Sequence, residues 1–419
     1  MNQTSQVGKY RWVICALLFF ACVINYMDRQ VLGLLKSELM KTFHWTQKDF
    51  GIINICFQSA YAFGQTVFGP LMEMIGTKAT YAFAITFWSL AAMSHALVTN
   101  LFGWGVARVA LGLGESGNYP TAIKTVAEWF PPRERSIATG IFNAGSNVGS
   151  IFAPLLVPWL FLTLGWKGAF VSLGAAGFLW LVFWLIYFQT PGKSKRVSAA
   201  ERAHIQTGVS ETAEAKIPWT KLLGYREAWA YYGTCVLVGP VWWFYGFWLP
   251  GFFNDQFHLD LTTFGRPLAF VAGVTAMGSI GGGGLSAWFL KMGWPLNRAR
   301  KTALLICAVC TLPVIMAPRV GNPWLAATFF AFAGAAHQGW SATMYSVVSD
   351  IFPKPAVASV VGFGGTLASL VSLVFFWYVS TQLQDTGSYK NIMLICGSAY
   401  VVAWVIFQTL VPRIQPARV

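Results

Sequence analysis

Charged side chains are scarce in this sequence. They make up 11% of its 419 residues, and acids are the rarer sign, with 15 Asp and Glu against 29 Lys and Arg. Soluble globular domains are usually about 25% charged. Apolar blocks of roughly 20 residues, the length needed to cross a bilayer as a helix, recur instead from end to end. The composition excludes an ordinary soluble protein and predicts a polytopic membrane protein in contact with the lipid bilayer.

Motifs of several functional classes are also missing. No G-x-x-x-x-G-K-[ST] phosphate-binding loop occurs, which argues against ATP-driven activity. The C-x-x-C of Cys307 and Cys310 lies in an apolar segment without a second ligand pair, so we interpret all seven cysteines as small buried residues. No nucleophile motif stands out. We therefore expect no enzymatic activity, no cofactor and no metal; an integral membrane enzyme and a channel are the alternatives from other classes.

The apolar blocks predict an all-α fold with twelve membrane-spanning helices. A polar segment separates six from six, so we expect an N-terminal six-helix bundle (1–189), a cytoplasmic linker (190–226) and a C-terminal six-helix bundle (227–419). The predicted spans are about 11–35, 49–72, 78–99, 101–124, 136–160, 167–188, 228–254, 264–289, 300–318, 323–348, 357–382 and 390–411.

The distribution of Lys and Arg predicts the orientation of these spans. A net charge of +14 would suggest a nucleic-acid partner in a soluble protein. With the N-terminus placed in the cytoplasm, however, 20 of the 29 basic residues fall in cytoplasmic segments, seven in external loops and two inside spans. This asymmetry follows the positive-inside rule. We predict that both termini are cytoplasmic and that no nucleic acid is bound.

A weak internal repeat relates the two halves. EWFP at 128–131 and DIFP at 350–353 each follow a predicted span, at an offset of 222 residues. The same offset aligns Glu115 with His337. Such repeats are typical of transporters built from two pseudo-symmetric bundles around a central substrate site. The pattern therefore favours two six-helix bundles that alternate access to a cavity between them.

Four charged residues lie well inside the predicted spans, away from the span ends: Asp28, Arg29, Arg108 and Glu115. A charge at this depth costs at least about 2.5–3.5 kcal/mol, so each must face a partner or a wet cavity. The arginines suit an anionic substrate, and the acids suit proton coupling. Arg108 and Glu115 are seven residues apart and share a helix face, but are too distant for an i,i+4 pair. The alternative is a structural network, for example Asp28 paired with Arg108.

Further polar and aromatic residues at span depth are candidates for substrate binding. Amides and hydroxyls suit a polyol, and aromatic faces suit the C–H face of a sugar ring. The alternative is that these side chains fill the bundle cores or form interfacial belts. The candidates are Tyr61, Gln65, Asn143, Asn147, Trp242, Tyr245, His337, Gln338, Thr366 and Ser369.

Several motifs resemble the major facilitator superfamily over almost the whole chain. They are NYMDRQVL, R-x6-E-S-G-N-Y-P, EWFPPRERSIATGIFNAGSNVGS and GGGGLSAWFLKMGWPLNRARK. More narrowly, the chain resembles the anion:cation symporter family, which includes hexuronate, galactonate and glucarate transporters and animal sialin. PVWWFYGFWLP and AHQGWSATMYSVVSDIFP resemble the hexuronate branch in particular.

The resemblance implies roles for individual residues. In that family the D-R pair of the first helix and the R-x6-E of the fourth serve anion binding and proton coupling, and they match Asp28, Arg29, Arg108 and Glu115. Tyr61 and Asn147 match a tyrosine of the second helix and a polar position of the fifth. The resemblance also implies a bacterial inner-membrane location, and we expect no obligate protein partner.

One motif departs from the superfamily pattern. The loop after the second helix usually reads G-x-x-x-D-R-x-G-R-[RK], whereas this chain has GPLMEMIGTK. Glu73 keeps the acid, but Met74 replaces the usual arginine. We expect the cytoplasmic gate between the halves to be weaker, or to use Lys78 and Arg133 with Glu73.

These observations predict a secondary transporter that imports a sugar-acid monocarboxylate by proton symport. Protons would be the only coupling ion, and the small organic anion the only other ligand. The residues leave open whether the substrate is glucuronate, galacturonate, galactonate, glucarate or another anion. A proton-independent facilitator or exchanger, with purely structural acids, is the alternative within the same class.

Overall fold

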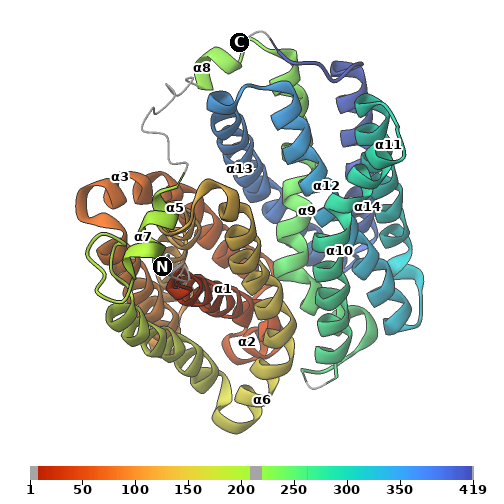
Figure 1. The fold of residues 1–419 in the computed structure, drawn as a ribbon. Helices are drawn as coiled ribbons and strands as arrows, with labels where there is room; N and C mark the ends of the chain where they lie inside the picture. The colour runs from red at the N-terminus through yellow and green to blue at the C-terminus, as the bar shows by residue number, and fades with distance from the viewer. Residues whose placement is uncertain (1–7, 208–218, 262, 418–419) are drawn as a thin grey trace. The chain divides into compact units, whose positions relative to one another are not determined.

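The structure is a computed structural model that describes residues 8–207, 219–261 and 263–417. In this part of the chain all regular secondary structure is helical (Figure 1). By length and apolar composition alone, seven of the described helices can cross a bilayer.

Contacts divide the chain into two compact units. Unit 1 contains Met1–Val31 and Cys56–Ala213, and unit 2 contains Leu32–Ile55 and Glu214–Val419. This division differs from the predicted boundaries in two places: the segment that joins the first two spans packs in unit 2, and the first part of the predicted linker packs in unit 1.

Unit 1 contains most of the first six predicted spans. Its helices are α1 (Tyr10–Leu34, whose last residues belong to unit 2), α3 (Gln47–Ser94, whose first residues belong to unit 2), η1 (His95–Leu97), α4 (Leu101–Glu115), α5 (Asn118–Trp129), α6 (Pro132–Tyr187) and α7 (Ala199–Gln206).

Two of these helices each cover two predicted spans. The backbone of α3 breaks at Gly76 (φ 79°) and that of α6 at Gly165 (φ 70°). A positive φ is accessible to glycine because it lacks a Cβ, so the chain can turn there and begin a new helix. The breaks lie between the predicted spans 49–72 and 78–99, and between 136–160 and 167–188.

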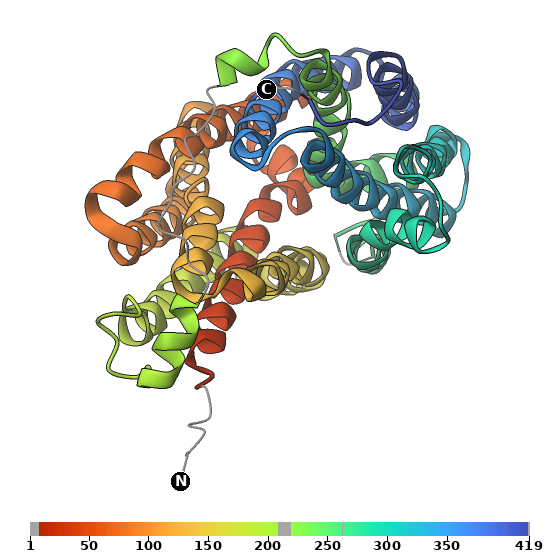
Figure 2. The same ribbon diagram turned by 45° about the horizontal axis from the view of Figure 1, so that its top comes forward.

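Unit 2 contains the last six predicted spans. α12 contacts both α10 and α11, and α9 contacts α13 and α14 (Figures 1 and 2). The helices of this unit are α2 (Lys36–Phe43), α8 (Trp219–Leu222), α9 (Arg226–Phe257), α10 (Gly265–Lys291), α11 (Leu296–Thr311), η2 (Leu312–Arg319), α12 (Pro323–Ile351), α13 (Lys354–Thr386) and α14 (Lys390–Leu410).

A buried lysine explains why the segment around α2 packs in unit 2. Lys36 is 1% exposed, and its Nζ lies 3.5 Å from Asp255 Oδ2 of α9. Tyr389 donates a hydrogen bond to the same carboxylate oxygen over 2.7 Å. Burial lowers the pKa of Lys36, while Asp255 opposes that shift. The ion pair compensates a charge that would otherwise be costly away from water.

Glycines in α4 allow it to lie directly against α3. A Cβ at Gly114 would lie 2.8 Å from the backbone N and 2.9 Å from the Cα of Trp88. These are backbone atoms that cannot rotate away. Only glycine therefore fits at this contact, one residue before Glu115 at the end of α4.

We expect Gly114→Ala to destabilise unit 1 by about 1–3 kcal/mol, the usual cost of overpacking. The measurement is thermal unfolding of the purified protein in detergent. Gly140→Ala in α6 is the matched control, because a Cβ at this position would have no described atom outside its own helix within 4 Å. Equal effects of the two changes would contradict the close contact.

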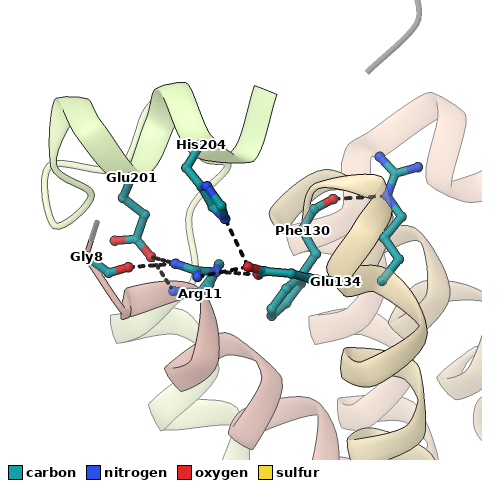
Figure 3. A network of polar contacts seen from close by, with 7 residues as sticks. Gly8, Arg11, Phe130, Glu134, Glu201 and His204 are labelled. Carbon is teal, nitrogen blue, oxygen red and sulfur yellow. Dashed lines mark hydrogen bonds and ion pairs between the residues drawn. The ribbon is translucent and has the colours of Figure 1, made fainter. Parts of the chain in front are cut away.

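The helix α7 is held against the rest of unit 1 by a network of charged side chains (Figure 3). Arg11 donates to Glu201 Oε1 from its backbone N over 3.0 Å and from Nη1 over 3.3 Å. The Nε of Arg11 also donates to Glu134 Oε2 over 2.8 Å, and His204 Nε2 lies 2.9 Å from Glu134 Oε1. This end of the predicted linker is thus fixed by contacts of α7 with α1 and α6.

Glu201 is placed by the start of its own helix. The Ser198 hydroxyl caps α7 by accepting a hydrogen bond from the Glu201 backbone N over 3.1 Å. Val197 and Ile205 are buried on either side. The Glu201 side chain is 1% exposed, so its charge depends on Arg11 for compensation.

Arg11→Ala would leave the Glu201 charge buried without its ion-pair partner. Breaking such a pair costs about 3–5 kcal/mol, and we expect a loss of stability of this order in thermal unfolding, together with faster proteolysis around α7. Lys195→Ala, at an exposed position of the same segment, is the control and should change neither. An unchanged unfolding temperature for Arg11→Ala would rule out the network as the anchor of α7.

Candidate functional site

The four charged residues predicted at span depth are buried in unit 1. Asp28 and Arg29 lie on α1, and Arg108 and Glu115 lie on α4. Arg108 and Glu115 are 0% exposed, and Asp28 and Arg29 are 3% and 5% exposed. Their order along the two helices follows from the sequence, but their pairing depends on how α1 and α4 pack.

Arg29 and Glu115 form an ion pair between α1 and α4. The distance from Arg29 Nε to Glu115 Oε2 is 3.0 Å. A second nitrogen of Arg29, Nη2, donates to Asn25 Oδ1 over 3.4 Å. The guanidinium also lies 4.6 Å from the Tyr61 ring centroid and 5.0 Å from that of Tyr26. Cation–π contacts of this kind stabilise a desolvated arginine.

Asp28 lies beside this pair but is not part of it. In the described part of the chain neither carboxyl oxygen of Asp28 has a hydrogen-bond partner. The structural pair of Asp28 with Arg108, which the sequence left as an alternative, is therefore not formed. Arg108 lies over the Phe57 ring, with its guanidinium carbon 4.4 Å from the ring centroid.

The other candidates of unit 1 differ in their contacts and in their exposure to solvent. Tyr61 contacts Arg29 directly. Asn143 accepts a hydrogen bond from Tyr119, a residue of α5 that the sequence analysis did not select. Gln65 is exposed, and Asn147 is half-buried.

Asn25 and Tyr26 were also missed as neighbours of Arg29. They precede it by four and three residues on α1, which is the spacing of side chains on one helix face. That spacing is visible in NYMDR and could have been used to select them.

Candidates of unit 2 form an uncharged cluster of rings. Trp242 of α9 stacks on His337 of α12, with centroids 4.3 Å apart and planes at 6°. The Tyr400 hydroxyl of α14 lies 2.6 Å from His337 Nδ1. No sequence motif selected Tyr400, because α14 is distant in the chain from α9.

The remaining candidates of unit 2 lie on the same or neighbouring helices. Tyr245, one turn after Trp242, packs edge-on against Phe330 at 5.5 Å between centroids. Gln338 is half-buried and Ser369 is buried. Thr366 is exposed and donates to the Gly362 carbonyl in its own helix over 3.1 Å.

Comparison with known proteins identifies the family of the chain. A family model described as Major Facilitator Superfamily matches residues 18–376. The chain belongs to this superfamily. It is therefore a multi-pass membrane transporter rather than an enzyme, which confirms the predicted family and all-helical fold class.

Similar proteins include several sugar-acid transporters. The chain is 29% identical to the hexuronate transporter of Escherichia coli strain K12, over 99% of this chain and 97% of that protein. It is 29% identical to a galacturonate transporter of Dickeya chrysanthemi, over 61% and 75%. It is 27% identical to the probable galactarate/D-glucarate transporter GudP of Bacillus subtilis strain 168, over 97% and 92%.

Solved structures share the fold at low sequence identity. A D-xylose-proton symporter gives a TM-score of 0.75 at 13% identity, covering 96% of this chain and 98% of that one. A bacterial homologue of the human lysosomal transporter Spinster, in an inward-facing and unoccupied conformation, gives 0.73 at 17% identity, covering 97% and 96%.

Of the three predicted gating residues, Lys78 has a hydrogen bond within unit 1. Lys78 Nζ donates to the Leu185 carbonyl over 2.9 Å, and Arg133 is exposed. The side chain of Glu73 lies outside the described part of the structure. In unit 2, at the offset of 222 from Lys78, Arg300 Nε lies 3.0 Å from Asp350 Oδ2. Lys78 and Arg300, which the repeat offset aligns, thus have different kinds of partner: a backbone carbonyl for Lys78 and a carboxylate for Arg300.

Removing one or both partners of the Arg29–Glu115 pair tests its contribution to stability. Arg29→Leu leaves a carboxylate buried without its arginine and should cost about 3–5 kcal/mol in thermal unfolding, whereas removing both partners of a buried pair is often neutral. We therefore expect Arg29→Leu with Glu115→Leu to regain most of the lost stability. A double variant as unstable as the single one would show that the pair does not hold α1 and α4 together.

Proposed function

We propose that this transporter imports a sugar-acid monocarboxylate, a hexuronate such as glucuronate or galacturonate, by proton symport through alternating access. The observation that carries the proposal is the cluster in which the Arg29–Glu115 pair adjoins a second buried acid, Asp28, without a described hydrogen-bond partner. The names of the similar hexuronate and galacturonate transporters support the substrate class.

Charge balance explains why an anion and a proton would move together. With both acids ionised, Asp28, Glu115, Arg29 and Arg108 carry two negative and two positive charges. A substrate carboxylate adds one negative charge in a region where uncompensated charge is expensive. One proton on either acid restores neutrality, so the loaded cluster holds at least one proton for each anion.

The two acids would have different roles. A proton on Asp28 breaks no hydrogen bond of the described structure, so Asp28 is suited to proton loading. A proton on Glu115 weakens its ion pair with Arg29 and frees the guanidinium for the substrate carboxylate. In the reverse direction, loss of the proton lets Glu115 compete for Arg29 and expel the anion.

Charge balance also favours a monocarboxylate over a dicarboxylate. A galactarate or glucarate dianion would need two protons, or a third positive group, for the same neutral loaded state. The similarity to a probable galactarate/D-glucarate transporter makes these sugar acids the second candidate class. The excess of Lys and Arg in the predicted cytoplasmic segments supports an inner-membrane protein with both termini inside.

Uptake into proteoliposomes tests the proposal. We expect an inward proton gradient to drive accumulation of labelled glucuronate or galacturonate by the unmodified protein. Glu115→Gln should lower gradient-driven accumulation by about tenfold or more, equivalent to at least 1.4 kcal/mol of lost coupling, while counterflow exchange of the same sugar acid persists. The neutral amide can still accept from Arg29 but cannot carry the proton.

The matched control is Glu38→Gln, an acid-to-amide change outside the charged cluster, whose partner is Lys41 in the same short helix. It should leave uptake unchanged. Uptake of galactarate in place of the uronates would assign the substrate to the second candidate class, the dicarboxylate sugar acids. Uptake of a uronate that is insensitive to the gradient would indicate a facilitator with structural acids and would refute symport.

A further inference from the structure

The ring cluster of unit 2 holds an imidazole in one orientation. His337 is stacked on Trp242 and lies perpendicular to the ring of Tyr400, at 90° and 6.1 Å between centroids. Tyr400 is itself 0% exposed and packs edge-on against Trp340 at 5.6 Å. Because three helices, α9, α12 and α14, contribute these rings, His337 cannot turn without repacking all of them.

The hydrogen bond of Tyr400 decides which nitrogen of His337 carries the proton. The phenol hydroxyl lies 2.6 Å from His337 Nδ1, its only acceptor in the described part of unit 2. If Nδ1 carried a hydrogen, as in the other neutral tautomer or the imidazolium, the buried phenol hydrogen would have no acceptor there. This geometry favours Tyr400 as the donor and a neutral His337 with its hydrogen on Nε2.

The resulting Nε2–H group has only a weak hydrogen-bond acceptor in the described part of the protein. The nearest described partner is the Ser341 hydroxyl, one turn along α12, at 3.5 Å, which is the long limit for a hydrogen bond. His337 is half-buried rather than enclosed. A well-oriented N–H donor with only a weak internal partner can bind an acceptor on a ligand.

The chemistry of the cluster indicates the kind of acceptor. His337, Trp242 and Tyr400 present a neutral donor beside aromatic faces, whereas unit 1 supplies the arginines suited to a carboxylate. A neutral donor suits a hydroxyl or ring oxygen of a sugar. The repeat offset of 222, which aligns His337 with Glu115, places both residues at equivalent positions of the two halves.

We propose that His337, oriented by Tyr400, recognises a hydroxyl or ring oxygen of the sugar acid, and that Tyr400 is the positioning residue that keeps the hydrogen on Nε2. This assignment rests on the proposed function. The assignment concerns unit 2 alone, where His337 would select acids that carry a polyol.

Tyr400→Phe tests the positioning role, because it removes the hydroxyl and keeps the ring that packs on Trp340. We expect KM for the transported uronate to rise about tenfold, as for a lost oriented hydrogen bond, with little change in maximal rate. Nitrogen-15 NMR of His337, assigned by the signal lost in His337→Gln, should show hydrogen on Nε2 in the unmodified protein and a tautomer mixture in Tyr400→Phe.

The control for Tyr400→Phe is Tyr232→Phe, also in unit 2, where the buried hydroxyl has no described hydrogen-bond partner. It should leave KM and the histidine signals unchanged. His337→Gln keeps an N–H donor near the position of Nε2 and should retain more uronate affinity than His337→Ala. Thermal unfolding of each variant separates lost recognition from lost folding.

A carboxylate without hydroxyls, cyclohexanecarboxylate, tests whether the His337 cluster recognises the hydroxyls of the substrate. As a competitor of uptake, it should have the same inhibition constant in the unmodified protein, Tyr400→Phe and His337→Ala. Hydrogen on Nδ1 in the unmodified protein, or equal weakening of uronate and cyclohexanecarboxylate, would overturn the inference. If Tyr400→Phe and His337→Ala both kept gradient-driven uronate uptake with an unaltered KM, the inference about His337 would be overturned and the proposed function would stand.

Discussion

Arg29 and Glu115 are held together almost completely out of contact with water, and α1 and α4 cannot separate without leaving a charge uncompensated. The arginine of the pair also lies over the rings of Tyr61 and Tyr26, and the neighbouring Asp28 is not part of the pair. Both proposed activities of the site, anion binding and proton binding, consist of replacing one partner of this pair by a substrate carboxylate or a proton. In the proposed function, the contact that joins α1 and α4 would also couple the anion to the proton.

The packing of α4 places the acid of this pair. Gly114 allows the helix to reach the backbone of α3 at Trp88, and Glu115 follows at the end of the helix. A helix with a larger residue at this point would lie farther from α3, and its carboxylate would no longer be positioned by the contact. The glycine-rich stretch around Glu115 is therefore explained by geometry and serves the site indirectly.

The two units contribute different chemistry. Unit 1 contains the buried acids and arginines of the cluster, with aromatic rings that shield the cations. At the position that the offset of 222 residues aligns with Glu115, unit 2 has His337, which stacks on Trp242 and lies 2.6 Å from the Tyr400 hydroxyl. The two units thus carry unlike side chains at positions that the repeat offset aligns.

The sequence by itself determined the fold class and the four buried charges, because a bilayer imposes a length on every apolar segment and a penalty on every charge within it. It did not determine that Arg29 rather than Arg108 pairs with Glu115, that Glu201 pairs with Arg11, or that the Tyr400 hydroxyl lies next to His337. Each of these contacts joins residues at least 60 positions apart. Only tertiary packing decided them, since local periodicity fixes the face of a helix but not the neighbour that this face meets.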